Sequence, residues 1–227
     1  MNINNLLKIA LRALTNNKLR AFLTMLGIII GVASVITMLA IGQGSKRSIQ
    51  AQISEMGSNM IMIHPGGEMR GGVRQDPSEM QTLKLENYQT LSEECTYLSA
   101  ISPQVSSSGQ LIHGANNYPS SVSGVSIDYL KIRQLTVEQG DMFTEADIKT
   151  SAKVCVIGKT IVDNLFPDGE SPIGKIIRFN KIPFRVVGVL KSKGYNSMGM
   201  DQDDIVLAPY TTMMKRLLAV TYLEGIF

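Results

Sequence analysis

The chain has 227 residues, enough for one large domain or two small ones, and a hydrophobic fraction of 44%, which is ordinary for a globular protein. The net charge of +3 is unevenly placed. The four basic residues before residue 21 give +4, and the rest of the chain gives −1, from 18 Lys and Arg against 19 Asp and Glu. The basic excess therefore lies in one flank and does not indicate a nucleic-acid-binding domain.

Residues 3–19 alternate apolar and polar side chains at helical spacing. One face carries Ile3, Leu6, Leu7, Ala10, Leu11 and Leu14, and the other carries Asn4, Lys8, Arg12 and Thr15. This pattern predicts an amphipathic helix on the cytoplasmic membrane surface, within a segment that we place at residues 1–20.

Residues 21–45 form an uncharged and mostly apolar run of 25 residues. Roughly 20 apolar residues cross the ~30 Å hydrocarbon core as a helix, so a transmembrane helix is predicted at residues 21–44. A cleaved signal peptide would have a shorter apolar core and a small-residue cleavage site, which this run lacks. The basic residues that precede it outnumber those that follow, Lys46 and Arg47, and predict a cytoplasmic N-terminus. These topology anchors are Lys8, Arg12, Lys18 and Arg20.

Gly27 and Gly31 lie four residues apart in this run. Such glycines leave a groove in which a second helix can approach, so we expect a helix-packing face there, although glycine is also common in membrane helices. Beyond the membrane, Ile49 and Ile53 keep helical spacing. We expect a stalk helix over residues 45–56, ended by Gly57.

The remaining residues, 57–227, alternate strand and helix patterns and predict an α+β domain with mixed sheets. Residues 65–81 are glycine-rich and read as a loop. Predicted strands lie at 59–64, 98–111, 118–125, 154–157, 175–179, 184–190 and 204–208, and predicted helices at 84–95, from 128, at 160–165 and at 211–218. Cys95 and Cys155 could pair outside the cytoplasm, but Cys155 reads as part of a buried strand.

No catalytic, cofactor-binding or metal-binding constellation is predicted. Gly158-Lys159-Thr160 follows a strand and precedes a helix, but Lys153 stands where a phosphate-binding loop needs its first glycine. The acidic residues at 201–204 lack the glycine and the distal Glu of a calcium loop, so they read as a solvated turn. His64 and His113 have no Cys or carboxylate cluster beside them in the sequence.

Several stretches resemble the MacB-type, MacB/FtsX-like, permeases of ABC transporters, in the family's order along nearly the whole chain. In the membrane region they are Leu-Arg-Ala-Leu at 11–14, Asn-Lys-Leu-Arg at 17–20 and the run 23–36. In the later domain they are 56–59, 124–125, 128–129, 140–144, 172–175, 184–190 and 209–212.

The resemblance implies a first transmembrane helix followed by a periplasmic core domain with two α/β lobes, one porter-like and one inserted within it. It implies a bacterial inner-membrane location, with residues 45–227 periplasmic, and three further membrane helices that this chain does not contain. It also implies a non-enzymatic subunit without a cofactor of its own. The implied partners are a separate ABC ATPase chain, a second permease copy or related permease, membrane lipid, and a periplasmic adaptor with an outer-membrane channel.

The function implied is ATP-driven export of drugs, peptides or lipid-linked cargo by mechanical movement of the periplasmic domain. Within the family, FtsX-like signalling and lipoprotein release are alternatives. Outside it, a single-pass anchored binding or adaptor module remains open, and an enzyme is a more distant third hypothesis.

Overall fold

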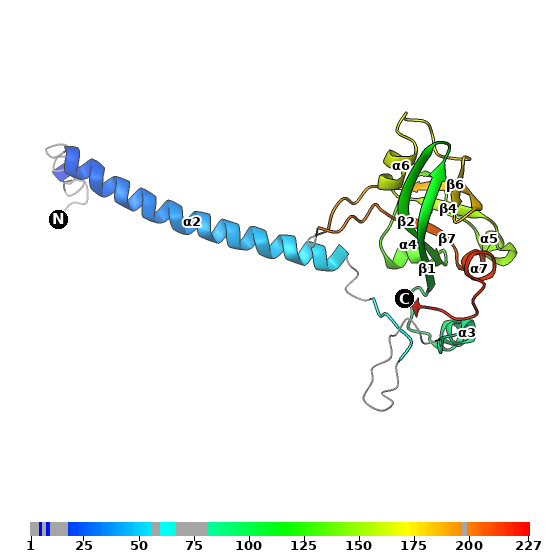
Figure 1. Ribbon diagram of the computed structural model, residues 1–227. Helices are drawn as coiled ribbons and strands as arrows, with labels where there is room; N and C mark the ends of the chain where they lie inside the picture. Colours follow the sequence, from blue (N-terminus) through cyan, green and yellow to red (C-terminus); the bar gives the residue numbers. More distant parts are fainter. Residues whose placement is uncertain (1–4, 6–7, 10–17, 56–59, 67–80, 197–198) are drawn as a thin grey trace, which may run out of the picture. The chain divides into compact units, whose positions relative to one another are not determined.

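The computed structural model describes residues 5, 8–9, 18–55, 60–66, 81–196 and 199–227, and the chain divides into two compact units, Met1–Ile53 and Ser54–Phe227 (Figure 1). The first unit is dominated by α2 (Lys18–Glu55), 38 residues long. One helix thus runs through both segments that the sequence assigned to the membrane and the stalk. The amphipathic segment 3–19 lies largely outside the described residues, since only Asn5, Lys8 and Ile9 and the first two residues of α2 are described.

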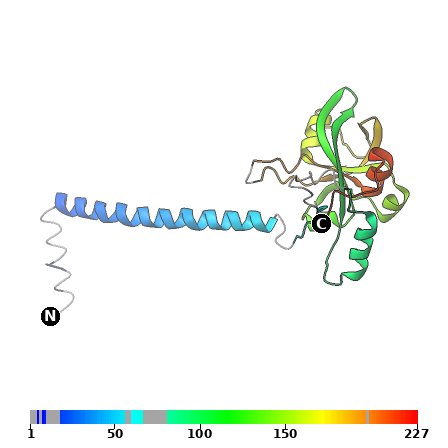
Figure 2. The same ribbon diagram turned by 60° about the horizontal axis from the view of Figure 1, so that its bottom comes forward.

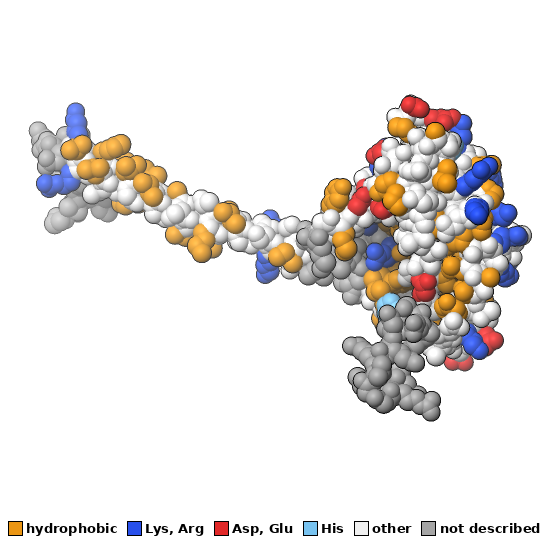
Figure 3. All heavy atoms as spheres, in the orientation of Figure 1, with side chains coloured by type: hydrophobic (Ala, Val, Ile, Leu, Met, Phe, Trp, Pro, Cys, Tyr) orange, Lys and Arg blue, Asp and Glu red, His pale blue; other side chains and the backbone are white. Residues whose placement is uncertain are grey.

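The stretch Lys18–Gln50 of α2 is long and apolar enough to cross a membrane, with a mean hydropathy of 2.4 in its most apolar window. None of this window is buried, and many of its large apolar side chains are exposed; the orange atoms in Figure 3 show those on one side of the helix. Three hydroxyl groups in its apolar part bond within the helix: Thr24 Oγ1 donates to Arg20 O at 2.9 Å, Ser34 Oγ to Gly31 O at 2.9 Å and Thr37 Oγ1 to Ala33 O at 2.8 Å. A helix that hides its polar groups and exposes its apolar ones suits hydrocarbon rather than water.

The second unit is built on a ring of six strands. Neighbouring strands pair in the order β1–β2–β7–β4–β6–β5 and back to β1, through two parallel pairs, β2–β7 and β4–β6, and four antiparallel ones. The ring strands are β1 (Pro103–His113), β2 (Asn116–Val125), β4 (Val154–Ile157), β5 (Ile176–Phe179), β6 (Ile182–Leu190) and β7 (Val206–Pro209). Two short strands join it from outside: β3 (Val137–Gly140) pairs with β6, and β8 (Gly225–Ile226) pairs with β1.

Alternation of side chains decides which residues fill the ring. Along β5 and the start of β6, buried and exposed residues alternate, so Phe179 and Phe184 point inward while Arg178 and Arg185 point out. The inward residues form the main core with helices α6 (Lys159–Leu165) and η2 (Met213–Leu218), which contribute Ile161, Leu165, Met213 and Met214. Cys155 lies in this core and is free, and Cys95 is free and exposed, so the two do not pair.

A second core lies on the outside of the ring, where α4 (Tyr129–Ile132) and α5 (Glu145–Thr150) cover β4 and β7. Its members include Tyr129, Ile148, Val156 and Leu207. β4 therefore has apolar residues on both faces, which explains its unbroken Val-Cys-Val-Ile sequence. Figures 1 and 2 show α3 (Leu85–Glu94) at a different end of the unit from α6.

The mixed α/β class predicted from the sequence is confirmed, and α3, β2, β4 and the β5–β6 hairpin lie where they were predicted. The predicted strand 59–64 differs: within 60–66 only Ile63 forms a bridge, to Ile226. The predicted helix 211–218 is a short turn, α7 (Tyr210–Thr212), that continues as the π-helix η2. β3, α5 and β8 were not predicted. The described part of Ser54–Phe227 groups as one compact unit, and its predicted division into a porter-like lobe and an inserted lobe stays a prediction.

The acidic turn at 201–204 was predicted to be solvated, and that prediction is wrong for Asp203. Its side chain is buried, and its carboxylate accepts hydrogen bonds from Ser192 Oγ, from Lys193 N at 2.8 Å and from Gly194 N at 3.0 Å. Burial by itself raises the pKa of this carboxyl, but the hydrogen bonds stabilise the charged form, and the net pKa lies below its ordinary value of 3.8. Residues 191–205 connect β6 to β7, and Asp203, near the end of this connection, bonds to residues 192–194 near its start.

We predict that Phe184→Ala lowers the free energy of unfolding by about 3–5 kcal/mol, because it leaves a cavity inside a closed ring that cannot collapse around it. The exposed change Ser108→Ala on the outer wall should stay within about 0.5 kcal/mol. Urea unfolding of the full chain in detergent micelles, followed by the circular dichroism of the sheet, measures both. A loss for Phe184→Ala no larger than for Ser108→Ala would contradict the packing described.

We also predict that Asp203→Asn destabilises the second unit by about 1–3 kcal/mol at neutral pH, because the amide turns a donor toward groups that already donate. The charged carboxylate stabilises the fold above the ordinary pKa, and this contribution is lost as the pH falls through the lowered pKa of the folded state. The difference between wild type and Asp203→Asn should therefore be constant from neutral pH to about 5 and shrink below 4. Urea titrations across this range test the trend, and a difference that grows with acid would refute it.

Candidate functional site

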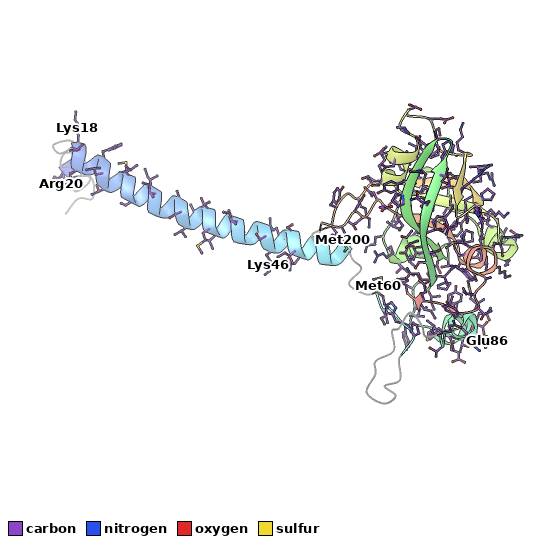
Figure 4. All side chains as sticks on the ribbon, in the orientation of Figure 1. Lys18, Arg20, Lys46, Met60, Glu86 and Met200 are labelled. Atoms are coloured by element: carbon purple, nitrogen blue, oxygen red, sulfur yellow. The ribbon has the colours of Figure 1, made fainter. Side chains whose placement is uncertain are left out.

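The entering segment of the second unit, residues 60–66, is hydrogen-bonded to the last strand of the chain. Residues 60–66 follow α2 in the sequence, and Ile63 forms a two-way hydrogen-bonded pair with Ile226, with N···O distances of 2.8 and 2.9 Å. Figure 4 labels Met60, the first described residue of this entering segment. The chain thus enters the fold directly beside β8.

β8 in turn is bound to the beginning of β1. Ser102 and Phe227 exchange two backbone hydrogen bonds of 2.9 and 2.8 Å, and Glu224 N donates to Gln104 O at 2.9 Å. The preceding residues bind the segment before α3, since Leu223 N donates to Leu83 O at 2.7 Å. We call residues 63, 83–84, 102–104 and 222–227 the junction.

Close packing at the junction depends on Gly225. A Cβ atom on this residue would lie 3.3 Å from Ile63 O and 3.5 Å from His64 Nδ1, so an added side chain would require the entering segment to shift by a few tenths of an ångström. Pro65 is buried beside these residues. Because the bonds run from Ile63 through β8 to β1, a displacement of the entering segment must either shear them or move the ring.

A surface cleft of about 510 Å³ lies beside α6 and the edge strand β3. Its charged lining residues are Glu138, Lys159, Asp163 and Glu170. Lys159 Nζ lies 3.0 Å from Asp163 Oδ1, and Glu170 pairs with Lys175, which lies outside the lining. The Lys175 ammonium lowers the pKa of Glu170 through this contact. An open cleft in which Lys159, Asp163 and Glu170 all have ionic partners offers no constellation for chemistry.

Gly158, Lys159 and Thr160 have structural roles in the fold. A Cβ on Gly158 would lie 2.1 Å from Asp203 O, so glycine is needed for the close approach of the chain, and Thr160 Oγ1 donates to Asp201 Oδ2 at 2.6 Å. Among the described residues there is no group of three or more His, Cys, Asp or Glu side chains arranged to hold a metal ion.

The site residues predicted from the sequence all belong to the first unit. Gly27 and Gly31 lie in α2, and a Cβ built on either meets no other atom within 4 Å. Lys18 and Arg20 are exposed at the start of α2, with Lys46 farther along the helix (Figure 4). Lys8 is exposed, and Arg12 lies outside the described residues. The junction was missed because its hydrogen-bonded partners are at least 120 residues apart in the sequence, and only the strand propensity at 59–64 hinted at it.

Comparison with known proteins identifies the fold. The family model for the MacB-like periplasmic core domain matches residues 21–226. A macrolide export ATP-binding/permease protein MacB from Syntrophobacter fumaroxidans is 43% identical over 209 residues, 92% of this chain and 29% of that protein. The protein of the same name from Hyphomonas neptunium is 40% identical over 222 residues, 96% of this chain and 33% of that protein. The chain therefore spans about a third of the length of these curated relatives.

Two solved structures share the fold of the second unit. The periplasmic region of MacB from Actinobacillus actinomycetemcomitans superposes with a TM-score of 0.64 at 29% identity, covering 77% of this chain and 75% of that one. The extracellular domain of the transporter YknZ from Gram-positive bacteria gives 0.58 at 17% identity, over 73% and 81%, which is a likeness of fold alone. With the family model matched over residues 21–226, the chain belongs to the family of proteins that carry a MacB-like periplasmic core domain.

Proposed function

We propose that this chain is part of the permease subunit of an ABC-type exporter, in which a separate ATPase chain drives movement of the second unit through α2. The observation that supports this most directly is the junction, where the segment that follows α2 is hydrogen-bonded through β8 to the ring. The exposed apolar surface of α2 supports an inner-membrane location like that of MacB proteins. In this scheme the chain itself catalyses no reaction.

The names of the relatives indicate macrolide export by those proteins. For this chain we propose export of a drug, a peptide or lipid-linked cargo, with a second permease copy as its partner in the membrane and a periplasmic adaptor leading to an outer-membrane channel. The Gly27 and Gly31 face of α2 is the proposed contact between membrane helices, since both positions are open to close approach.

The coupling is tested with the complete permease that contains this chain, purified with its ATPase in lipid vesicles. We predict that ATP hydrolysis and cargo export both require the pair, and that Ile63→Pro reduces export at least about tenfold, because proline removes the N–H that bonds to Ile226. Basal ATP hydrolysis should persist, since the variant does not touch the ATPase.

Ile61→Pro is the matched control, because Ile61 N donates none of the backbone hydrogen bonds recorded for the described residues. Equal losses in the two variants would show that transmission does not pass through the Ile63–Ile226 pair. Hydrolysis that never depends on assembly with the permease would overturn the exporter proposal and favour a membrane-tethered binding module.

We propose that Lys8, Arg12, Lys18 and Arg20 hold the N-terminus in the cytoplasm. Cys95 is exposed and Cys155 is buried, and burial raises the pKa of the Cys155 thiol, so one native cysteine reports the orientation. We predict that a membrane-impermeant maleimide added to spheroplasts labels the wild-type chain but not Cys95→Ser. Labelling of wild type only after the membrane is permeabilised would reverse the orientation.

A further inference from the structure

The outward wall of the β1–β2 hairpin combines exposure with an absence of charge. No Asp, Glu, Lys or Arg occurs from Cys95 to Ile127, a run of 33 residues in a chain that is 18% charged. The pairs Ser108–Ser121, Gln110–Pro119 and Ile112–Asn117 place their exposed side chains on the same face. We call this face the neutral strip; its members are Ser106, Ser108, Gln110, Ile112, Asn117, Pro119 and Ser121.

The strip is a face and not an edge, because β1 and β2 are both paired on their other sides within the ring. Figure 1 shows the hairpin in front of the unit with none of the described helices over it, and Figure 3 shows mostly white surface there, with blue side chains beside it. Solvated walls of sheets ordinarily carry Lys and Glu, whereas the centres of protein interfaces are depleted of charge. The absence of charge on this wall is therefore a property that it shares with the centres of contact surfaces.

Charges stand at the two ends of the strip and have opposite sign. At one end Arg178 lies opposite Ile112 on the same outward face. At the other end Glu224 Oε2 accepts a hydrogen bond from Ser106 Oγ at 2.5 Å. The ends are about 20 Å apart, six residues along a strand. A strip that is basic at one end, acidic at the other and neutral between is complementary to itself when one copy is turned by 180° about its centre.

We propose that the neutral strip is a contact between two copies of this chain, packed face to face and antiparallel, with Arg178 of each copy beside Glu224 of the other. The inference rests on the pairing of permease copies in the proposed function and assigns the surface that they use. The centre of the strip then lies on the two-fold axis, which brings Ser108 of one copy close to Ser108 and Gln110 of the second.

The small area of the strip limits the strength of this contact. Seven residues a side is well short of the roughly 20–30 of a stable interface, so the strip alone holds two free domains together only weakly. Anchoring both copies in one membrane through α2 raises their effective concentration without any new contact. The contact is therefore a property of membrane-tethered copies and can open and close as α2 moves.

Cross-linking of the full chain in lipid vesicles tests the surface. In a Cys95→Ser background, Ser108→Cys should give a covalent dimer with a short bismaleimide, whereas the exposed control Lys149→Cys on α5 should give little. Ser45→Cys lies five helical turns from Gly27 on the same face of α2 and reports pairing of the membrane helices independently. Each variant is first checked for an unchanged circular dichroism spectrum.

The ionic ends are tested by charge exchange. Arg178→Glu and Glu224→Arg should each lower the Ser108→Cys dimer about threefold, the size expected when two surface ion pairs are lost, and the double variant should restore it. Cross-linking at Ser45→Cys without any at Ser108→Cys would overturn the surface while leaving copy pairing intact. No cross-linking at either position would overturn both, and equal yields at Lys149→Cys and Ser108→Cys would show random collision and refute the proposal.

Discussion

Closure of the six strands into a ring is the constraint on which the rest of the second unit depends. An open sheet of this composition would leave β1 and either β2 or β5 as edge strands with unpaired backbone groups, and its inward face would need another layer to cover it. Pairing β1 with both β2 and β5 removes these edges and encloses Phe179 and Phe184. The ends of the enclosed core are then filled from α6 and η2.

The junction is attached to a stiff part of the fold, because β1 belongs to the closed ring. β8 is only two residues long and would contribute little by itself, but it is bonded to the start of β1, which is held along both of its sides. α2 is similarly stiff, since its 38 residues span about 57 Å, nearly twice the thickness of the hydrocarbon core. Within the second unit, the entering segment is attached to the ring through the few hydrogen bonds of the junction.

The elements that were predicted correctly are those whose own sequence carries a clear apolar or alternating pattern. The uncharged run predicted α2, and the buried Val-Cys-Val-Ile predicted β4. Asn180 and Lys181 both take positive φ in the tight β5–β6 turn, which the flanking strand patterns located correctly. The elements that were missed have sequences with little pattern of their own. β3 is mostly exposed and β8 is two residues long, so both exist because a partner strand lies beside them.

The junction and the burial of Asp203 were beyond prediction for the same reason. Nothing near Ile63 in the sequence shows that its partner is Ile226, and nothing near Asp203 shows that Ser192, Lys193 and Gly194 will direct donors at it. For the β1–β2 hairpin, composition gives a misleading prediction of burial. Its lack of charge is obvious in the sequence and is typical of a buried segment, yet six residues of its strands are exposed: Ser108, Gln110, Ile112, Asn117, Pro119 and Ser121.

That contradiction between composition and exposure is informative because the inner residues of the hairpin already account for its folding. Val105, Leu111 and Val122 fill the ring, and replacing the outward Ser108 or Gln110 with Lys or Glu would cost the isolated unit almost nothing. Stability therefore does not explain why the outward positions are neutral, whereas contact with another surface does, because a charge buried there would lose its water without gaining a partner. The same reasoning explains why Arg178 and Glu224 stand at the ends of this wall, where a second copy can pair with them.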